Sequence, residues 1–231
     1  MALKADLDAY CYDTFVGTWE KRNGTVVPLD TSLKLSNDGI NLNATVLYAD
    51  LADSTVMVDQ EIEGFAAEVY KSFLYCAAKV IRAHGGTVTA YDGDRIMAVF
   101  IGDSKNTSAV KAALQINWTV KNIVQVQLKA VYKDKFFTVN HVVGIDTSDL
   151  LVAKTGIRGS NDLVWVGRAA NYAAKLSALS HERPTYITAE VYNQLNDEEK
   201  FSAGTNIWKP YKWNTFDDRI IYGSTYWWTV A

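Results

Sequence analysis

The feature that most constrains this chain is a strand-forming run that ends in a carboxylate. Residues 43–52, NATVLYADLA, have the β-branched and aromatic content of a buried strand. Asp50 lies near the end of this run, where the chain normally emerges from the core. A buried strand that ends in an acid points to a site at the edge of a sheet.

A second acidic segment follows after one helix. Residues 87–102, TVTAYDGDRIMAVFIG, predict a strand, a tight turn and a strand, because Asp92-Gly93 is a strong hairpin signal. Asp94 lies in this turn. The helix between the two segments is predicted over 60–84 by apolar residues at steps of three and four.

The order of predicted elements indicates the fold class. Further elements are a helix over 106–128, two strands over 136–157 around Asp146–Asp149, a strand over 163–167, a helix over 168–180, a strand and helix over 185–195, and a β-hairpin within 206–230. Hairpins alternating with helices predict an α/β (α+β) ferredoxin-like palm, with a mixed, mainly antiparallel sheet, flanking helices and a C-terminal β-hairpin.

Length and composition favour one domain. The chain has 231 residues, of which 48% are hydrophobic, enough for a sizeable core. We expect residues 1–41 to be an N-terminal extension that packs on the domain, 42–195 to be the catalytic core, and 196–231 to be the C-terminal hairpin region.

Charge and motifs exclude several classes of function. A net charge of −3 argues against a general binder of nucleic acid or of membrane surfaces. The sequence shows no signal peptide and no apolar run of membrane-spanning length. Two isolated cysteines fit a reducing compartment, so a cytoplasmic location is expected, and three scattered histidines argue against a zinc site.

The two acidic segments predict a shared metal site. Their strands are neighbours in a ferredoxin-like sheet, so Asp50 and Asp94 would face each other, which is unfavourable unless a cation lies between them. Mg²⁺ and Mn²⁺ bind carboxylate oxygens together with phosphates, and phosphoryl transfer with two metals is the natural chemistry. Ordinary turn aspartates are the alternative, as is a site that uses Asp92 instead of Asp94.

Four segments together resemble the catalytic domain of the class III nucleotidyl cyclases. VLYADLADST resembles their first metal strand and phosphate loop, AYDGDRIMAVF their second metal hairpin, HVVGIDTSDLLVAKTGI their central hairpin, and WVGRAANYAAKL their transition-state helix. The matches keep the family order and cover about residues 42–190. Ser148 stands where the family usually has glycine.

The resemblance implies roles for individual residues. Asp50, Asp94 and the backbone carbonyl of Leu51 would hold two ions of Mg²⁺ or Mn²⁺. The amides of Ala52, Asp53, Ser54 and Thr55 would cradle phosphate.

On the helix, Asn171 would orient the ribose and Lys175 would stabilise charge on the α-phosphate. Lys175 replaces the family's usual arginine, a planar fork that can bind two oxygens. Arg168 is a candidate helper, with a solvated surface arginine as the alternative. The family's triphosphate lysine matches Lys212, or alternatively Lys209.

The resemblance also implies a head-to-tail homodimer. Asn171 and Lys175 lie one helical turn apart and share a face. In the family this face completes the site of the opposite subunit.

The family's purine-reading positions are occupied here by Ala90 and Val164, neither of which can hydrogen-bond a base. A polar base edge buried there would lose about 1–3 kcal/mol per group. Three bulky residues, Tyr48, Tyr91 and Trp165, lie close in sequence and could narrow the pocket toward a pyrimidine, although sheet packing would also explain them.

This combination resembles the compact bacterial pyrimidine cyclases of antiphage (Pycsar) defence. The resemblance implies conversion of UTP to 3′,5′-cyclic UMP, a signal read by a separate cyclic-nucleotide effector. CTP or ATP as substrate, and a non-catalytic nucleotide-binding or dimerisation module, are the alternatives. A diguanylate cyclase shares the palm, but its GGDEF-like turn is missing.

Overall fold

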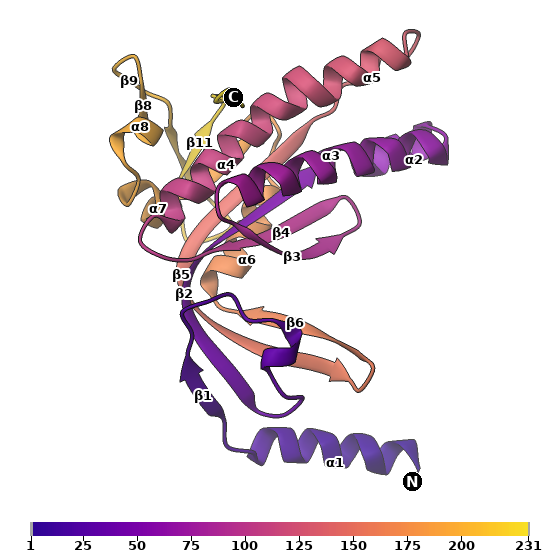
Figure 1. Ribbon diagram of the computed structural model, residues 1–231, viewed down its shortest axis with the longest axis vertical. Helices are drawn as coiled ribbons and strands as arrows, with labels where there is room; N and C mark the ends of the chain where they lie inside the picture. The colour runs from indigo at the N-terminus through magenta and orange to yellow at the C-terminus, as the bar shows by residue number, and fades with distance from the viewer. Residues whose placement is uncertain (1, 231) are drawn as a thin grey trace.

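The computed structural model describes residues 2–230, which form one large sheet with helices on both faces (Figure 1). The helices are α1 (Leu3–Val16), α2 (Ser54–Gln60), α3 (Glu63–Ala83), α4 (Lys105–Thr119), α5 (Gln125–Val131), α6 (Arg168–Ser177), α7 (Ala189–Asn193) and α8 (Asp197–Lys200). A 3-10 turn spans Asp30–Ser32, and a π-helical turn, Val120–Val124, joins α4 to α5.

The main sheet has nine strands, of which seven form the path β10-β11-β7-β5-β2-β4-β3. These are β10 (Lys209–Trp213), β11 (Arg219–Ser224), β7 (Thr185–Thr188), β5 (His141–Ile157), β2 (Asp38–Leu51), β4 (Arg95–Phe100) and β3 (Thr87–Asp92). Off this path, β1 (Glu20–Asn23) pairs with β2 and β6 (Ser160–Val166) with β5, while β8 (Phe201–Ser202) and β9 (Thr205–Asn206) form a separate ladder.

The pairing confirms the predicted fold class. Only β1–β2 and β5–β7 are parallel in the main sheet, so it is mixed and mainly antiparallel. The C-terminal β-hairpin is present as β10–β11.

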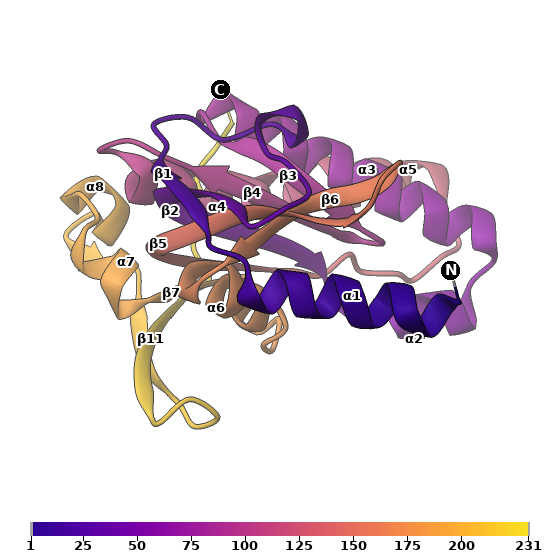
Figure 2. The ribbon, with the colours of Figure 1, turned by 90° about the horizontal axis from the view of Figure 1, so that it is seen from below.

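Two apolar layers hold the helices on the sheet. Residues from α3 and α4, including Phe73 and Leu114, pack on one face of β2, β4 and β5. Helix α6 covers the other face through Ala169, Ala170 and Ala173. Figure 2 shows α6 on the opposite side of the sheet from α3, with the β10–β11 hairpin projecting beyond it.

Helix α6 lies unusually close to β5 because the strand carries a glycine there. A Cβ at Gly144 would stand 2.2 Å from the carbonyl oxygen of Ala173. Only glycine lets the two backbones approach to this distance. The close contact fixes the position of the helix that carries Asn171 and Lys175.

One expectation about an individual segment is wrong. Residues 136–157 do not form two strands, because β5 runs unbroken from His141 to Ile157. The N-terminal extension contributes Leu33 and Val27 to the apolar cluster under α6, whereas its helix α1 has no buried residue and Phe15 is exposed. Figure 1 shows α1 at the far end of the molecule from α3 and α4.

The extension nevertheless joins the sheet through β1. Arg22 of β1 forms an ion pair with the buried Asp38 of β2, and its guanidinium also donates to the carbonyl of Ser32 at 2.6 Å. None of the helices within residues 2–230 combines the length and apolar character that crossing a membrane requires.

Candidate active site

The structure brings the two predicted acidic segments together at one edge of the sheet. Strand β2 pairs antiparallel with β4, and Asp50 lies directly opposite Arg95. Asp94 precedes Arg95 in the β3–β4 turn, where Gly93 adopts a left-handed φ of 60°. The predicted neighbourhood of Asp50 and Asp94 is therefore confirmed.

The electrostatics of this edge fit a divalent cation. Burial and, after it, the negative charge of Asp94 raise the pKa of Asp50 to about 6, although the positive charge of Arg95 lowers it by a smaller amount. The Oδ2 atom of Asp94 is buried and has no hydrogen-bond partner among the described residues. A buried carboxylate oxygen without a partner is costly, and a cation would satisfy it.

The donor set consists of oxygen atoms alone. Within residues 2–230, no group of three or more His, Cys, Asp and Glu side chains could hold a metal. Asp50 and Asp94, with the carbonyl of Leu51 that the family resemblance adds, suit hard cations such as Mg²⁺ or Mn²⁺, which also bind substrate phosphates.

The loop after β2 lies beside these carboxylates. A cavity of about 280 Å³ is lined by residues 50–53, Val142 and residues 177–181. Asp53 has a left-handed φ of 61°, a strained conformation that aspartate tolerates better than most residues, and its carboxylate lies 3.4 Å from Nδ1 of His181. The amide of Ala52 already donates to the carbonyl of Asn140 at 3.0 Å, so it is not free to cradle phosphate in this conformation.

Three residues near this edge were not predicted from the sequence. Tyr70 of α3 lies near Asp94 and Asp50, and burial raises the pKa of its hydroxyl. The Arg95 guanidinium lies 5.6 Å from the ring centroid of Tyr48 and 2.9 Å from Asp92. Strand register could have placed Arg95 here, because it follows Asp94 directly, whereas no sequence signal indicates Tyr70 or His181.

The proposed base-reading residues separate into two groups. Tyr48, Ala90 and Trp165 all pack against the cluster between the sheet and α6. Val164 is 38% exposed and lies on the opposite face of β6 from Trp165, because successive strand residues alternate faces. One chain therefore does not bring Val164 and Trp165 to the same pocket.

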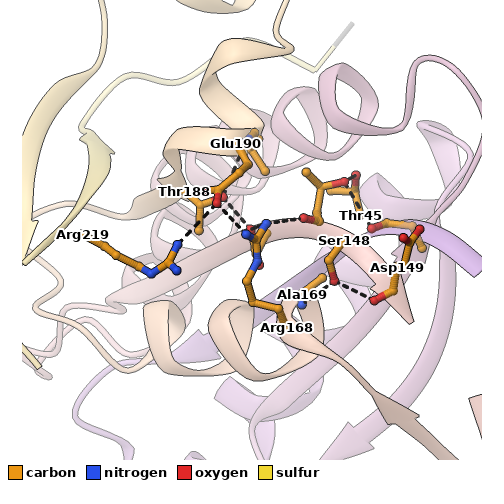
Figure 3. A network of polar contacts seen from close by, with 12 residues as sticks. Thr45, Ser148, Asp149, Arg168, Ala169, Thr188, Glu190 and Arg219 are labelled. Atoms are coloured by element: carbon orange, nitrogen blue, oxygen red, sulfur yellow. Dashed lines mark hydrogen bonds and ion pairs between the residues drawn. The ribbon is translucent and has the colours of Figure 1, made fainter. Parts of the chain in front are cut away.

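Helix α6 begins at a side-chain cap. The hydroxyl of Ser148 accepts a hydrogen bond of 2.9 Å from the amide of Ala169 and donates to the carbonyl of Asp149 (Figure 3). An amide in the first turn of a helix has no partner within the helix. The serine that replaces the family's usual glycine thus has a structural role at the start of α6.

Arg168, the first residue of α6, is held inside a network of polar contacts (Figure 3). Its guanidinium makes four hydrogen bonds: two to the buried Asp146, at 3.0 and 3.3 Å, one to Glu190 and one to the carbonyl of Thr147 at 2.7 Å. Thr188 also donates to Asp146 at 2.6 Å. A guanidinium has five N–H groups, so this geometry favours anchoring α6 over contacting a phosphate.

Of the α6 residues, only Ser177, the last one, lines the Asp50 cavity of its own chain among the described residues. Asn171 and Lys175 are exposed, and neither lines that cavity. The Lys175 ammonium lies 4.9 Å from the ring centroid of Phe216, in the β10–β11 hairpin. Lys212 of the same hairpin is exposed, with its ammonium 3.9 Å from Asp218.

Comparison with known proteins decides the family. No protein-family model matches the chain. A uridylate cyclase of Xanthomonas perforans is 53% identical over 231 residues, and one of Burkholderia cepacia is 52% identical over 234 residues, each covering 100% of both chains. The protein belongs to the uridylate cyclase family. It is a nucleotidyl cyclase, as the resemblance of its four segments implies.

Solved cyclase structures share the fold of this uridylate cyclase family member. The crystal structure of the guanylyl cyclase Cya2 aligns with a TM-score of 0.68 at 17% identity, covering 80% of this chain and 92% of that chain. A likeness at this identity supports the fold only. The class III cyclase palm predicted from the sequence is thereby confirmed.

Proposed function

We propose that the protein converts UTP to 3′,5′-cyclic UMP and pyrophosphate at a site shared by two copies of the chain. The catalytic part of this proposal rests on the proximity of Asp50 and Asp94 at the end of β2. It also rests on the Oδ2 atom of Asp94, which is buried without a hydrogen-bond partner among the described residues. The names of relatives that match the full chain at 52% and 53% identity support UTP as the substrate.

The reaction is an intramolecular displacement at phosphorus. The ribose 3′-oxygen forms a bond to the α-phosphorus, the bond from that phosphorus to the α,β-bridging oxygen breaks, and the 3′-hydroxyl proton leaves to solvent. Two divalent cations, held by Asp50, Asp94 and the Leu51 carbonyl, would supply charge neutralisation and lower the pKa of the hydroxyl.

Other residues bind and orient the nucleotide in this proposal. The amides of residues 53–55 cradle the phosphates, and Lys212 neutralises the leaving pyrophosphate. Asn171 positions the ribose for in-line attack, and Lys175 stabilises the charge that develops on the α-phosphate.

A second copy of the chain would complete each site. The Asp50 cavity is lined by Ser177, the last residue of α6, and by residues 178–181 after it, and not by Asn171 or Lys175. Because those two side chains are exposed on the same helix face, they can serve the aspartates of a partner. A head-to-tail homodimer would therefore have two equivalent sites.

The choice of a pyrimidine is supported by the residues at the proposed base-reading positions. Tyr48, Ala90 and Trp165 pack against one cluster. In this proposal the two aromatic side chains leave room for one ring of a base and not for the second ring of a purine. Cyclic UMP would then act as a signal for a separate effector, and antiphage defence is the setting that the Pycsar-like features favour.

The test is incubation of the purified protein with each of the four nucleoside triphosphates and Mn²⁺, followed by mass identification of products. We expect cyclic UMP as the main product. Cyclic CMP or cyclic AMP as the main product would mean that CTP or ATP, and not UTP, is the preferred substrate, and the protein would still be a cyclase. No cyclic product from any of the four would favour a binding or dimerisation module.

A further inference from the structure

The β10–β11 hairpin packs an aromatic cluster against α6, beside Lys175. Trp213 is buried, and its ring lies 4.2 Å from that of Phe216 and 5.2 Å from that of Tyr172 on α6. Tyr172 and Phe216 meet edge to face at 5.3 Å. Backbone hydrogen bonds from Phe216 to the Trp213 carbonyl and from Arg219 to the Phe216 carbonyl fix the turn. The Phe216 ring is therefore held from several sides.

The exposed face of this cluster receives the Lys175 side chain. The ammonium stands 4.9 Å from the Phe216 ring centroid, within the range of a cation–π contact. In the part of the chain that the structure describes, Lys175 forms no ion pair with a carboxylate. The ring thus holds the ammonium in place without neutralising its charge.

The contact with the Phe216 ring offsets a disadvantage that lysine has relative to arginine at position 175. An arginine fork is pre-organised, whereas a lysine ammonium sits on a flexible stem of four carbons. An ammonium over a ring directs part of its N–H groups at the π face and keeps the others free for phosphate oxygens. The contact with Phe216 restricts the rotamers of the Lys175 side chain before the substrate binds. Less conformational entropy is then lost when Lys175 contacts the phosphate.

We infer that Phe216 is a positioning residue that orients Lys175 toward the α-phosphate bound by the partner copy. The inference rests on the proposed function, because Lys175 must stabilise the transition state for its orientation to affect turnover. The β10–β11 hairpin then carries two parts of the site: Lys212 and the ring that places Lys175.

The experiment compares Phe216→Leu, which keeps an apolar side chain but removes the ring, with Phe216→Tyr, which keeps the ring. We expect Phe216→Leu to lower kcat for UTP about 5-fold with KM nearly unchanged, since the contact acts in the transition state. Phe216→Tyr should retain most of the wild-type kcat. Phe201→Leu, on the separate β8–β9 ladder, is the matched control and should match the wild type.

Two further measurements separate positioning from a general structural role. In a Lys175→Ala background, Phe216→Leu should cause no additional loss of kcat, because the residue it orients is gone. Substituting fluorinated phenylalanines at position 216 should lower kcat stepwise as the ring loses electron density, with thermal stability unchanged. The inference is overturned if kcat does not change with fluorination, or if Phe216→Leu lowers kcat further in the Lys175→Ala background.

Failure of the inference and failure of the proposed function give different results. A wild-type protein that makes no cyclic nucleotide from any of the four triphosphates overturns both. An active wild type whose Phe216→Leu variant keeps its kcat overturns only the role of Phe216.

Discussion

Arg168, which is half-buried, forms an ion pair with the fully buried Asp146 at the junction between helix α6 and strand β5, with Nε 3.0 Å from Oδ2. The Asp146 side chain is fully buried, and burial raises the pKa of its carboxyl, while the hydrogen bond from Thr188 and the charge of Arg168 oppose this shift. The pair therefore anchors the helix that carries Asn171 and Lys175.

Removal of Arg168 should destabilise the fold. Arg168→Met would leave Asp146 buried without its counter-ion, which costs about 3–5 kcal/mol in the free energy of unfolding, measured by urea denaturation. Arg219→Met is the control, because its exposed pairing with Glu190 at 3.5 Å is worth about 1 kcal/mol or less. An Arg168→Met variant that is stable but inactive would instead support direct contact with substrate.

The same network explains why β5 continues where the sequence predicts a break. The sequence Asp146-Thr147-Ser148-Asp149 is typical of a turn and therefore predicts two strands. In the structure each of the four polar side chains finds a partner: Asp146 contacts Arg168, Thr147 donates to the carbonyl of Ala44, Ser148 caps α6, and Asp149 accepts from Asn43. These tertiary partners let the strand continue.

The edge at which Asp50 and Asp94 meet could be predicted, because it follows from sequence patterns together with the strand order of the palm. Strand propensity places Asp50, hairpin chemistry places Asp94, and neighbouring strands in the palm bring them together. Tyr70 could not be predicted in the same way, because it arrives from α3, and the contact of Lys175 with Phe216 joins segments 41 residues apart. The exposed α1 also escaped prediction, since its aromatic residues suggest packing that one chain does not provide.

The proposed metal site gives a prediction about three aspartates. Asp50→Ala and Asp94→Ala should each abolish cyclisation and leave the fold intact, because each variant removes a charged ligand. Asp92→Asn should keep most activity, since Asp92 is 78% exposed and pairs with Arg95. Product formation with Mn²⁺ and circular dichroism check these outcomes. Loss of activity in Asp92→Asn with retention in Asp94→Asn would move the metal ligand to Asp92.

The buried His141 predicts loss of stability in acid. Burial lowers the pKa of His141 to about 3, with a smaller effect from the charge of Lys121. Unfolding frees the ring to bind a proton near its usual pKa of about 6.5, so its stability contribution is full above that pH and is lost as the pH falls toward 3. The loss should reach on the order of 4 kcal/mol across this window.

Comparison of the wild type with His141→Phe isolates this effect. The raised pKa of Asp50 has the opposite effect on the free energy of unfolding, because the folded state binds a proton at Asp50 more readily than the unfolded state does as the pH falls. This effect is the same in the wild type and in His141→Phe, so it cancels in the comparison. Urea denaturation between pH 7 and pH 4 should give a steeper decline for the wild type than for His141→Phe. Parallel declines would mean that His141 stays neutral in the unfolded chain or is accessible in the folded one.

The proposed shared site predicts complementation between an inactive Asp50→Ala chain and a Lys175→Ala chain that keeps only residual activity. A mixture of Asp50→Ala and Lys175→Ala chains should recover part of the activity, because one of the two sites in a mixed dimer then has all of its residues. Co-expression with two different affinity tags isolates the mixed dimer for assay. Two Asp50→Ala chains carrying the two tags are the control and should stay inactive. Mixed dimers without activity would place Asp50 and Lys175 in the same chain's site.

Substrate choice gives the last prediction. Contacts to ribose and triphosphate are the same for all four nucleotides, so discrimination must come from the base. The Ala90 side chain offers no hydrogen bond to a purine, while Tyr48 is half-buried with its ring centroid 5.6 Å from the Arg95 guanidinium.

We expect the Tyr48 hydroxyl and backbone groups to hydrogen-bond the uracil edge. Tyr48→Phe removes one such partner and should lower kcat/KM for UTP by about 10-fold, which corresponds to one buried hydrogen bond of about 1.4 kcal/mol. Binding of Mn²⁺ and of pyrophosphate should be unchanged, since neither contacts the base. A steady-state comparison of UTP, CTP, ATP and GTP for both proteins measures this. Faster turnover of ATP than of UTP by the wild type would refute the pyrimidine pocket and leave the cyclase activity in place.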